Sequence, residues 1–433
     1  MTNRHPEQIK HFITVFLIAL LVSCYCPVGK SEENHSMEFD IAMFRLAGTE
    51  QVSEREGNNI FIYVPDDTDI TDIKTDITLS DQTTVSPPSG VPMDFTQPQT
   101  FTVKTSDGNQ HSFLVTVQRS PWRQVIANGA APFLKVDGHT LAVFKDKMWL
   151  LGGWLGRYDH DQATFTVGDN HWTSQVWCTS DGIHWESKGN APWAGRHGFG
   201  CVVHDDKLWV IGGDQHTDVW NTEDGVHWNK ILDTVPWGER YFPYIVSFQG
   251  KIWVMGGIRI IFPGSQMCDK YNDIWSTTDG VHWTREAEFV NWAPRGLISG
   301  TAVLNDELYL FGGCILYSYA FNDVWKTRDG VRWTKVVSHA PWPPRSWGSI
   351  ASYANRLWIM AGDLDTLNNT MLNDVWHSSD GATWTQQKGV FWKPRHAAPV
   401  VEFNNKLWLV GGLVSRTIGG EVSNDVWVMD FKE

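Results

Sequence analysis

The strongest constraint on the fold of this chain is an internal repeat with a period of about 45 residues. One copy is clear in Lys207–Arg240, where three short apolar runs, each with a Trp, are separated by Gly-Gly, an acidic linker and Asp-Gly. This spacing predicts strands at Lys207–Ile211, Asp218–Asn221 and Val226–Ile231. A fourth apolar run, Gly198–His204, precedes them. Repeats of this length with four strands per copy are typical of a β-propeller.

Six copies of the repeat are present. The second strand of each copy begins at Met148, Leu208, Ile252, Leu308, Leu357 and Leu407, and the third strand of each carries Trp177, Trp220, Trp275, Trp325, Trp376 and Trp427. The sixth copy reaches Phe431 without a fourth strand, and Ser120–Ile126 supplies a matching strand ahead of the first copy. We therefore predict an all-β fold with a six-bladed propeller closed by an N-terminal strand, which leaves no open sheet edge.

Three motifs give this region a family resemblance. The apolar strand ending in Gly-Gly, the Trp downstream of it and a later Trp-x-x-Arg resemble Kelch repeats, the propeller type of the galactose oxidase central domain and of sialate mutarotases. The turn Ser378–Trp384 is similar to the sialidase Asp-box, although one residue shorter. The resemblance covers residues 120–433 and implies a Kelch-like propeller. It does not fix the function, because propellers host unrelated activities.

The resemblance does not carry over the chemistry of these enzymes. A galactose oxidase-like copper site would need two His and two Tyr, one of them cross-linked to Cys, and the chain has no matching stretch. A sialidase would need a Tyr-Glu-Arg triad, which we do not find either. We therefore expect no cofactor and no metal.

The first residues have the pattern of a lipoprotein signal peptide. Arg4 and Lys10 precede the apolar run Phe12–Val22, which is too short to span a bilayer comfortably. It ends in Leu-Val-Ser-Cys24, which resembles a bacterial lipobox, so we predict a signal peptide at 1–23, lipidation of Cys24 and a tether at 24–36. An ordinary signal peptide is the alternative. The predicted location is the cell envelope, anchored to the outer membrane, with the direction it faces left open.

Residues 37–119 contain no Trp, many Thr and Asp, and short alternating strands. The predicted strands are Phe39–Leu46, Asn59–Val64, Ile73–Leu79, Gln99–Lys104 and Ser112–Val117. This pattern predicts a small β-sandwich. It resembles the immunoglobulin-like modules that follow the lipid anchor in Bacteroidetes surface proteins, which implies a spacer role.

Composition excludes one class of partner and makes crosslinks unnecessary. The net charge is −14 and no basic stretch offsets it, so we do not expect nucleic acid binding. The chain has 25 Trp, of which 22 occupy repeat positions, so burial of aromatic rings provides stability without a metal or disulfides. Cys268 and Cys314 could pair in an oxidising envelope, but free thiols are the alternative. We expect a monomer.

Five arginines are the sharpest candidates for a site. In a propeller, the loops from second to third strands and from fourth strands to the next blade open on one face. The first set is long in every blade but the second, which predicts a bowl with one low side. The second set carries the Trp-x-x-Arg arginines, namely Arg196, Arg240, Arg295, Arg345 and Arg395. They could bind an anionic ligand, or each could pair with an Asp of a neighbouring Asn-Asp-Val-Trp strand.

Aromatic and acidic residues are expected on the same face. Trp154, Trp172 and Trp347 lie outside the repeat positions and could stack on sugar rings, or could pack the blade-1 insert against the propeller. Arg157–Asp161 in that insert combines a cation, a His and carboxylates, which is a general-base pattern but also that of a solvated loop. Asp363 and Asp365 lie above blade 5, and we expect His139, His197 and His396 to line the channel.

These features favour a non-catalytic envelope lipoprotein whose propeller binds a glycan or a protein. One alternative is an enzyme acting on an acidic sugar, as a mutarotase, epimerase or lyase. Another is a structural docking protein. The pairing of the arginines discriminates between them, because unpaired arginines near a carboxylate or His favour chemistry, whereas fully paired ones favour binding or scaffolding.

Overall fold

The structure is a computed structural model that describes residues 41–156, 171–213, 216–260, 268–296, 300–315, 319–365, 370–415 and 421–431. Within these ranges the chain forms strands and turns and no helix, so the expected all-β class is confirmed. The predicted signal peptide, Cys24, the tether and the Arg157–Asp161 run lie outside the described residues. None of the described elements is a helix long and apolar enough to cross a membrane.

The first eight strands form two sheets that pack around one core. A three-stranded sheet has the order β1-β4-β6 and a five-stranded sheet the order β2-β3-β8-β7-β5. Their bounds are β1 Ile41–Leu46, β2 Val52–Glu56, β3 Asn59–Val64, β4 Ile73–Leu79, β5 Thr83–Ser86, β6 Pro92–Met93, β7 Gln99–Thr105 and β8 Gln110–Arg119. Inward-facing side chains such as Phe44, Phe101 and Phe113 alternate with exposed ones and fill the space between the sheets.

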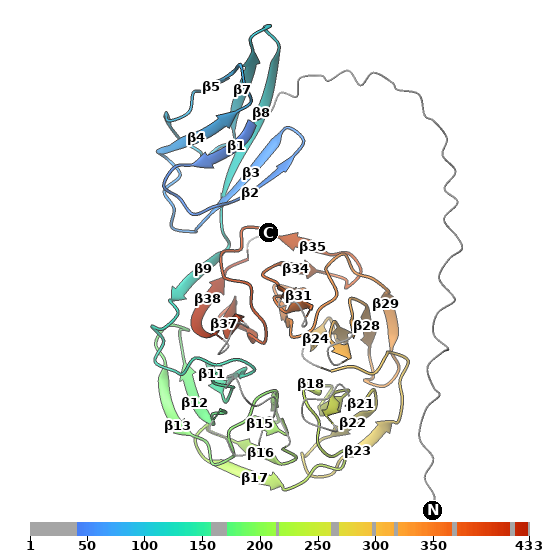
Figure 1. The fold of residues 1–433 in the computed structure, drawn as a ribbon. Helices are drawn as coiled ribbons and strands as arrows, with labels where there is room; N and C mark the ends of the chain where they lie inside the picture. Colours follow the sequence, from blue (N-terminus) through green and yellow to red (C-terminus); the bar gives the residue numbers. More distant parts are fainter. Residues whose placement is uncertain are drawn as a thin grey trace, which may run out of the picture.

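Residues 122–431 contribute six four-stranded sheets among the described residues, which we number 1 to 6 in chain order. Sheet 1 consists of β10 Thr140–Phe144, β11 Lys147–Leu151, β12 Gln175–Thr179 and β13 Glu186–Asn190. Sheet 2 consists of β14 Gly200–His204, β15 Lys207–Ile211, β16 Val219–Thr222 and β17 Trp228–Leu232. Sheet 3 consists of β18 Tyr244–Phe248, β19 Lys251–Met255, β22 Ile274–Thr277 and β23 Thr284–Ala287. Figure 1 shows the six sheets in a ring, each with its first strand near the centre.

Sheets 4 to 6 complete the ring. Sheet 4 consists of β24 Gly300–Leu304, β25 Glu307–Phe311, β28 Val324–Thr327 and β29 Thr334–Val337. Sheet 5 consists of β30 Ser349–Tyr353, β31 Arg356–Met360, β34 Val375–Ser378 and β35 Thr385–Gln387. Sheet 6 consists of β36 Val400–Phe403, β37 Lys406–Ser415, β38 Glu421–Met429 and β9 Trp122–Ile126. The outer strand of sheet 6 is β9, which pairs antiparallel with β38. The strand that precedes sheet 1 in the chain therefore completes sheet 6.

Two-residue turns join the first two strands of every sheet. In each turn both residues have positive φ, which is the type I′ geometry that matches the twist of paired strands. The turns are Lys145-Asp146, Asp205-Asp206, Gln249-Gly250, Asn305-Asp306, Ala354-Asn355 and Asn404-Asn405. Asn, Asp and Gly tolerate this conformation best, and at least one of them stands in each turn.

Neighbouring sheets contact through the Asp-Gly turns. Gly225 of sheet 2 has φ +76°, and a Cβ atom there would collide with the Trp149 ring of sheet 1. The same arrangement places Gly182 of sheet 1 against Trp408 of sheet 6. Sheets 1 and 6 thus make the same contact as sheets that follow one another in the chain.

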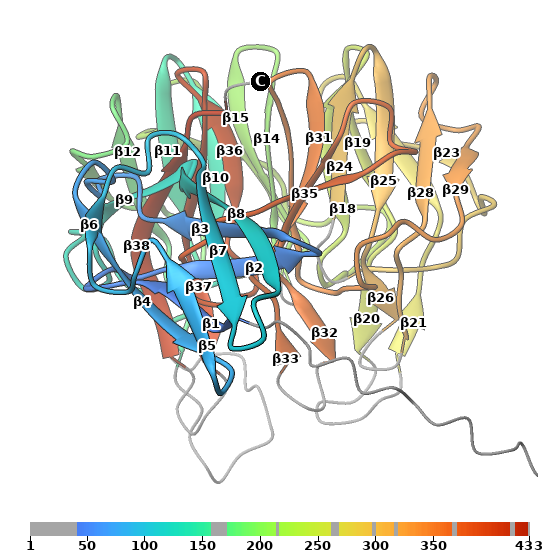
Figure 2. The same ribbon diagram turned by 90° about the horizontal axis from the view of Figure 1, so that it is seen from above.

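Short hairpins project from one face of the ring. They extend sheets 3 to 5 and consist of β20 Ile258–Ile260 with β21 Cys268–Lys270, β26 Cys314–Ile315 with β27 Tyr319–Ala320, and β32 Asp363–Asp365 with β33 Thr370–Met371. In sheet 6 the strands β37 and β38 are themselves long and pair as far as Ser415 and Glu421. Figure 2 shows these extensions on the same side of the ring. We call this side the hairpin face.

Candidate functional site

The five Trp-x-x-Arg arginines are buried, and each pairs with one aspartate. Both terminal nitrogens of the guanidinium group donate to the two oxygens of one carboxylate, at 2.5 to 3.1 Å. The pairs are Arg196–Asp218, Arg240–Asp273, Arg295–Asp323, Arg345–Asp374 and Arg395–Asp425. The arginines are 0 to 4% exposed. This is the structural alternative for these residues, and their direct contact with a ligand stays a prediction.

Four of the arginines, namely Arg196, Arg295, Arg345 and Arg395, also join two sheets. The Arg196 Nη1 donates to the carbonyl of Gly212 in sheet 2, while its backbone N–H donates to the carbonyl of Thr173 ahead of sheet 1's third strand. Burial raises the pKa of Asp218, but the hydrogen bonds and the charge of Arg196 outweigh it, so the pKa is lowered overall. The balance is the same for Asp273, Asp323 and Asp425. At the junctions of these four arginines a charged pair therefore holds the second and third strands of one sheet to the sheet before it.

Sheet 1 replaces both members of the pair. Val136 takes the place of the arginine, since its carbonyl accepts a hydrogen bond from Gly412 as that of Arg196 does from Gly153. Gln175 takes the place of the aspartate, and its side chain accepts from the Trp177 indole and donates to the Gly152 carbonyl. The cation and the anion are lost together, so no buried charge is left without a partner.

The residues that directly follow the arginines surround the channel on the hairpin face. They are Asp137 after Val136, and then His197, Tyr241, Gly296, Ser346 and His396. Backbone bridges tie several of them to the residue after Gly-Gly, or after Ala361-Gly362 in the fifth repeat. Examples are Asp137 with Trp154, Ser346 with Asp363 and His396 with Leu413. We call this set the mouth.

A histidine between two carboxylates joins three sheets at the mouth. His396 Nδ1 lies 2.9 Å from Asp363 Oδ2, and Nε2 lies 3.3 Å from Asp137 Oδ2. All three side chains are buried. Both ring nitrogens therefore face carboxylate oxygens, and a nitrogen that carries a proton can donate it to the carboxylate beside it.

Aromatic rings close the centre of the mouth. Trp347 is stacked between His197 and His396, with ring centroids 6.1 and 5.2 Å apart, and Phe242 packs edge-on to Trp347 at 4.5 Å. Phe242 and Trp347 have φ of +50° and +56°, where the equivalent residues of sheets 1 and 2 are Gly138 and Gly198. Bulky residues rarely adopt this conformation, and each such residue costs on the order of 1–3 kcal/mol. Packing of the rings across the mouth holds them there.

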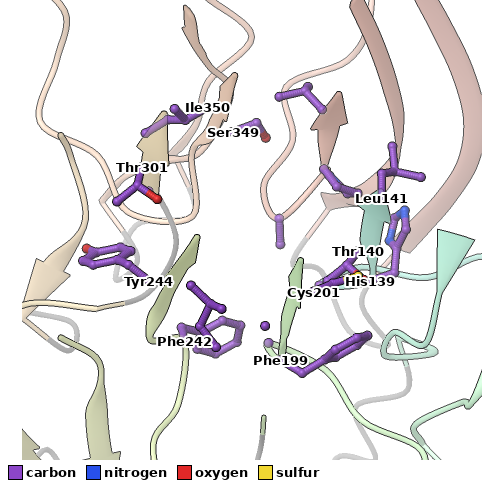
Figure 3. Close-up of a pocket in the computed structure, with 18 of the residues that line it drawn as sticks. His139, Thr140, Leu141, Phe199, Cys201, Phe242, Tyr244, Thr301, Ser349 and Ile350 are labelled. Atoms are coloured by element: carbon purple, nitrogen blue, oxygen red, sulfur yellow. The ribbon is translucent and has the colours of Figure 1, made fainter. Parts of the chain in front are cut away.

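A cavity of about 240 Å³ lies along the ring axis next to these rings. Its walls come from the first strands of all six sheets, and Figure 3 shows Leu141, Cys201, Thr301 and Ile350 around it. The lining combines apolar side chains with the polar groups of His139, Thr140, Thr301 and Ser349, and it includes no Arg or Lys. Burial raises the pKa of the Cys201 thiol to about 12, so the thiol stays protonated.

The three predicted sugar-stacking tryptophans are covered to different degrees. Trp154 and Trp347 are 5% and 9% exposed, and Trp172 is half-buried. Trp154 forms backbone bridges with both Asp137 and Trp172. This burial favours the packing alternative for Trp154 and Trp347, whereas Trp172 keeps an accessible surface.

Cysteines and metal ligands add no further site among the described residues. Cys178, Cys201, Cys268 and Cys314 form no disulfide bond. Cys268 and Cys314 pack in one apolar cluster with Phe242 and Ile258. In the described part of the chain no group of three or more His, Cys, Asp or Glu side chains could hold a metal ion.

Sequence reasoning missed part of the mouth. Of the mouth residues it named His197 and His396, but not Asp137, Tyr241 or Ser346. Of the residues packed against the mouth it named Asp363 but not Phe242. The signal was available in the repeat, because the two residues that follow each arginine occupy equivalent places in every sheet. Asp137 was hidden because sheet 1 lacks the arginine that marks this place.

The comparisons with known proteins separate the two parts of the chain. Residues 41–117 match the family model described as "SGBP, N-terminal". The chain is similar in structure to the solved "Structure of YjhT", with a TM-score of 0.55 and 16% identity over 71% of this chain and 98% of that one. No curated protein matches the chain in sequence. The first match concerns the sandwich, and the second, at this identity, concerns the fold alone.

Proposed function

We propose that this protein is a surface glycan-binding protein of the bacterial cell envelope and that it binds its glycan without catalysis. The observation that carries the proposal is the match of the sandwich to the SGBP N-terminal family. In this proposal residues 37–119 are an immunoglobulin-like module. Residues 120–433 form one six-bladed Kelch-like propeller closed by β9, which the ring of six sheets and the similarity to the YjhT structure support.

The hairpin face is the proposed binding surface. The hairpins of sheets 3 to 6 rise around the mouth, and Trp172, His197 and Tyr241 keep partly exposed side chains there. The buried arginines, Trp154 and Trp347 would support this surface from below. A half-buried indole beside polar groups suits a sugar ring, which offers both an apolar face and hydroxyl groups.

The pairing of the arginines bears on the kind of sugar. Each guanidinium group is neutralised by its own aspartate, and the mouth adds the carboxylates of Asp137 and Asp363. This charge pattern supports a neutral glycan over an acidic one. The His396 arrangement gives no support to the enzyme alternative, because both of its nitrogens already face carboxylates.

Affinity gel electrophoresis tests the binding proposal. Gels would contain neutral polysaccharides (a soluble cellulose ether, a galactomannan) or the acidic polygalacturonate, and the probe is the purified protein in detergent. We expect retardation by a neutral polysaccharide, and loss of it in Trp172→Ala and His197→Ala. The matched control is His227→Ala on the opposite face, whose side chain is 88% exposed. Retardation by polygalacturonate alone would contradict the proposed sugar class.

The envelope location is proposed from the lipobox-like sequence at Cys24. Lipidation there would anchor the protein to the outer membrane. We expect Cys24→Ala to abolish incorporation of radiolabelled palmitate and to release the protein from the membrane fraction. Palmitate labelling that survives this substitution would contradict the assignment of Cys24.

A further inference from the structure

The junction between the sandwich and sheet 6 is short and is held by direct contacts. Only Ser120 and Pro121 separate β8 from β9, so no flexible linker intervenes. The buried Ser120 donates from its backbone to the Val64 carbonyl and from its hydroxyl to the Gly389 carbonyl at 2.6 Å. The ammonium group of Lys388 contacts the Glu54 carboxylate at 2.8 Å. Figure 1 shows the sandwich beside β9 and β38.

Close packing adds to these polar contacts. Gly389 has φ +74°, and a Cβ atom there would lie only 3.0 Å from the Tyr63 ring. A side chain at this position would push the two parts of the molecule apart. The two surfaces that meet here are therefore held in one relative position, and any hollow between them exists before a ligand arrives.

Two hollows of about 480 Å³ each flank this junction and share Asp66 as a common wall. Each is in the size range of small-ligand sites, which often lie at domain interfaces. In one hollow the sandwich contributes Glu50 and Asp67, and the opposite wall contributes Phe391, Lys393 and Trp427. We call the two hollows together the junction groove.

The groove mixes charges without a strong net sign. Asp66 faces Arg123 at 3.5 Å, and Arg395 in the wall is already paired with Asp425. Lys393 and Asp67 are exposed, with opposite charges. The amides of Gln124 and Asn128 add groups that both donate and accept. The cations Arg119, Arg123, Lys393, Arg395 and Lys406 are matched in the lining by the carboxylates Glu50, Asp66, Asp67, Asp425 and Asp430. A polyanion would therefore meet as many negative as positive charges, whereas a neutral ligand rich in hydroxyl groups finds donors, acceptors and a half-buried aromatic ring at Phe391.

We propose that the junction groove is a second glycan-binding site, which takes a segment of a neutral oligosaccharide between the sandwich and sheet 6. The inference rests on the proposed glycan-binding function but assigns a site apart from the hairpin face. Asp67 would accept hydrogen bonds from sugar hydroxyls and Lys393 would donate to them. The apolar face of a sugar ring would lie on Phe391. The fixed junction makes the site preformed.

The test compares variants of the full-length protein in the affinity gels described above. The groove variant is Asp67→Ala with Lys393→Ala, and both side chains are exposed, so folding should be unaffected and is checked by thermal unfolding. The control is Glu56→Ala, an exposed carboxylate in β2 that does not line the groove. We expect the affinity for the neutral polysaccharide that retards the wild type to fall at least tenfold in the groove variant and to stay unchanged in the control.

The outcomes separate this inference from the proposed function. If the groove variant is retarded as strongly as the wild type while Trp172→Ala is not, the groove site is refuted and binding at the hairpin face stands. If only the groove variant loses retardation, the glycan binds in the groove rather than on the hairpin face. If no polysaccharide retards the wild type, the glycan-binding function is contradicted, and the groove site with it.

Discussion

The paired arginines at the sheet junctions affect stability mainly through what their removal would leave behind. A buried ion pair contributes little compared with apolar residues of the same shape, because both charges lose water. Removal of one partner is different, since it leaves an uncompensated charge in the interior. In this ring five junctions depend on such a pair, so we expect each arginine to be a strong determinant of stability and only an indirect one of binding.

We predict that Arg395→Ala lowers the free energy of unfolding by about 3–5 kcal/mol, because it leaves the buried Asp425 carboxylate without its partner. Urea unfolding followed by Trp fluorescence measures this, since all 25 Trp lie at or after Trp122 and so report on the six sheets. The matched control is Arg332→Ala, which removes an 89% exposed arginine paired with Asp329 and should cost less than about 1 kcal/mol. Equal losses in the two variants would contradict the buried-pair argument.

The Asp-Gly turns give a second prediction at the scale of the residue. Gly225→Ala should destabilise the protein more than Gly238→Ala, although both glycines have nearly the same φ, +76° and +74°. A Cβ atom on Gly225 would collide with the Trp149 ring of the neighbouring sheet, while a Cβ atom on Gly238 has nothing within 4 Å. The difference between their urea midpoints isolates the packing between sheets from backbone strain. Indistinguishable midpoints would mean that the Trp149 ring moves aside at no cost.

At the scale of the element, sheet 1 lacks the ion pair because both of its members are replaced together. Val136 and Gln175 form a neutral version of the junction, in which the glutamine amide takes over the hydrogen bonds to Trp177 and Gly152. This is the same logic by which apolar replacement of a whole buried pair is tolerated while single replacement is not.

A double-mutant cycle tests this compensation. Val136→Arg alone places a buried cation beside a neutral glutamine, and Gln175→Asp alone places a buried anion beside a valine, so we expect both to be strongly destabilising. The double variant recreates the pair of the other sheets and should be more stable than the sum of the single effects by at least about 1 kcal/mol. Thermal unfolding of the four proteins measures this coupling. Additive effects would show that sheet 1 cannot accept the pair.

The elements could be predicted from the sequence because each carries its own local signal. The third-strand Trp occurs in every repeat, while Gly-Gly and the Asp-Gly turn each occur in five of the six, and Trp122 marked β9 as the partner of β38. The mouth was harder to predict, because its side chains come from separate repeats. Nothing in the sequence around His396 indicates that Asp137, more than 250 positions earlier, faces its ring. The arginines left two alternatives open, since pairing and ligand binding require the same residue.

At the scale of the whole molecule, the arginine pairs make stability depend on acid pH. The aspartate carboxyls of four pairs have pKa values below their usual range in the folded protein. Because the pKa of each carboxyl is lower in the folded than in the unfolded protein, its ionised form stabilises the fold at pH values above the unfolded pKa of about 3.9. This contribution is lost as the pH falls through the lower, folded pKa. We therefore expect the urea midpoint to drop steeply below about pH 4. A midpoint that is constant down to pH 2.5 would contradict the role of these pairs.

Buried histidines predict a second, earlier loss of stability. Burial lowers the pKa of His139. The charge of nearby Asp137 acts in the opposite direction, but burial outweighs it and the pKa falls to about 3. The unfolded chain binds a proton at this His near pH 6.5 and the folded chain does not, so stability falls as the pH drops from about 6.5 toward 3. Each such His contributes a slope of up to about 1.4 kcal/mol per pH unit. His377, lowered to about 4 by burial and by Arg356, acts in the same direction.

The variant that isolates this effect is His139→Phe, because Phe199 already occupies the equivalent place in sheet 2 and shows that the ring of sheets accepts a phenyl group there. Above pH 7 both proteins carry a neutral ring at this position, so their urea midpoints should be close. Between pH 6.5 and 4 the wild type should lose stability more steeply than the variant, because only its unfolded state gains a proton at residue 139. Below pH 4 both should fall together as the aspartates protonate. Parallel curves from pH 7 to 4 would show that His139 takes up its proton in the folded ring as readily as in the unfolded chain.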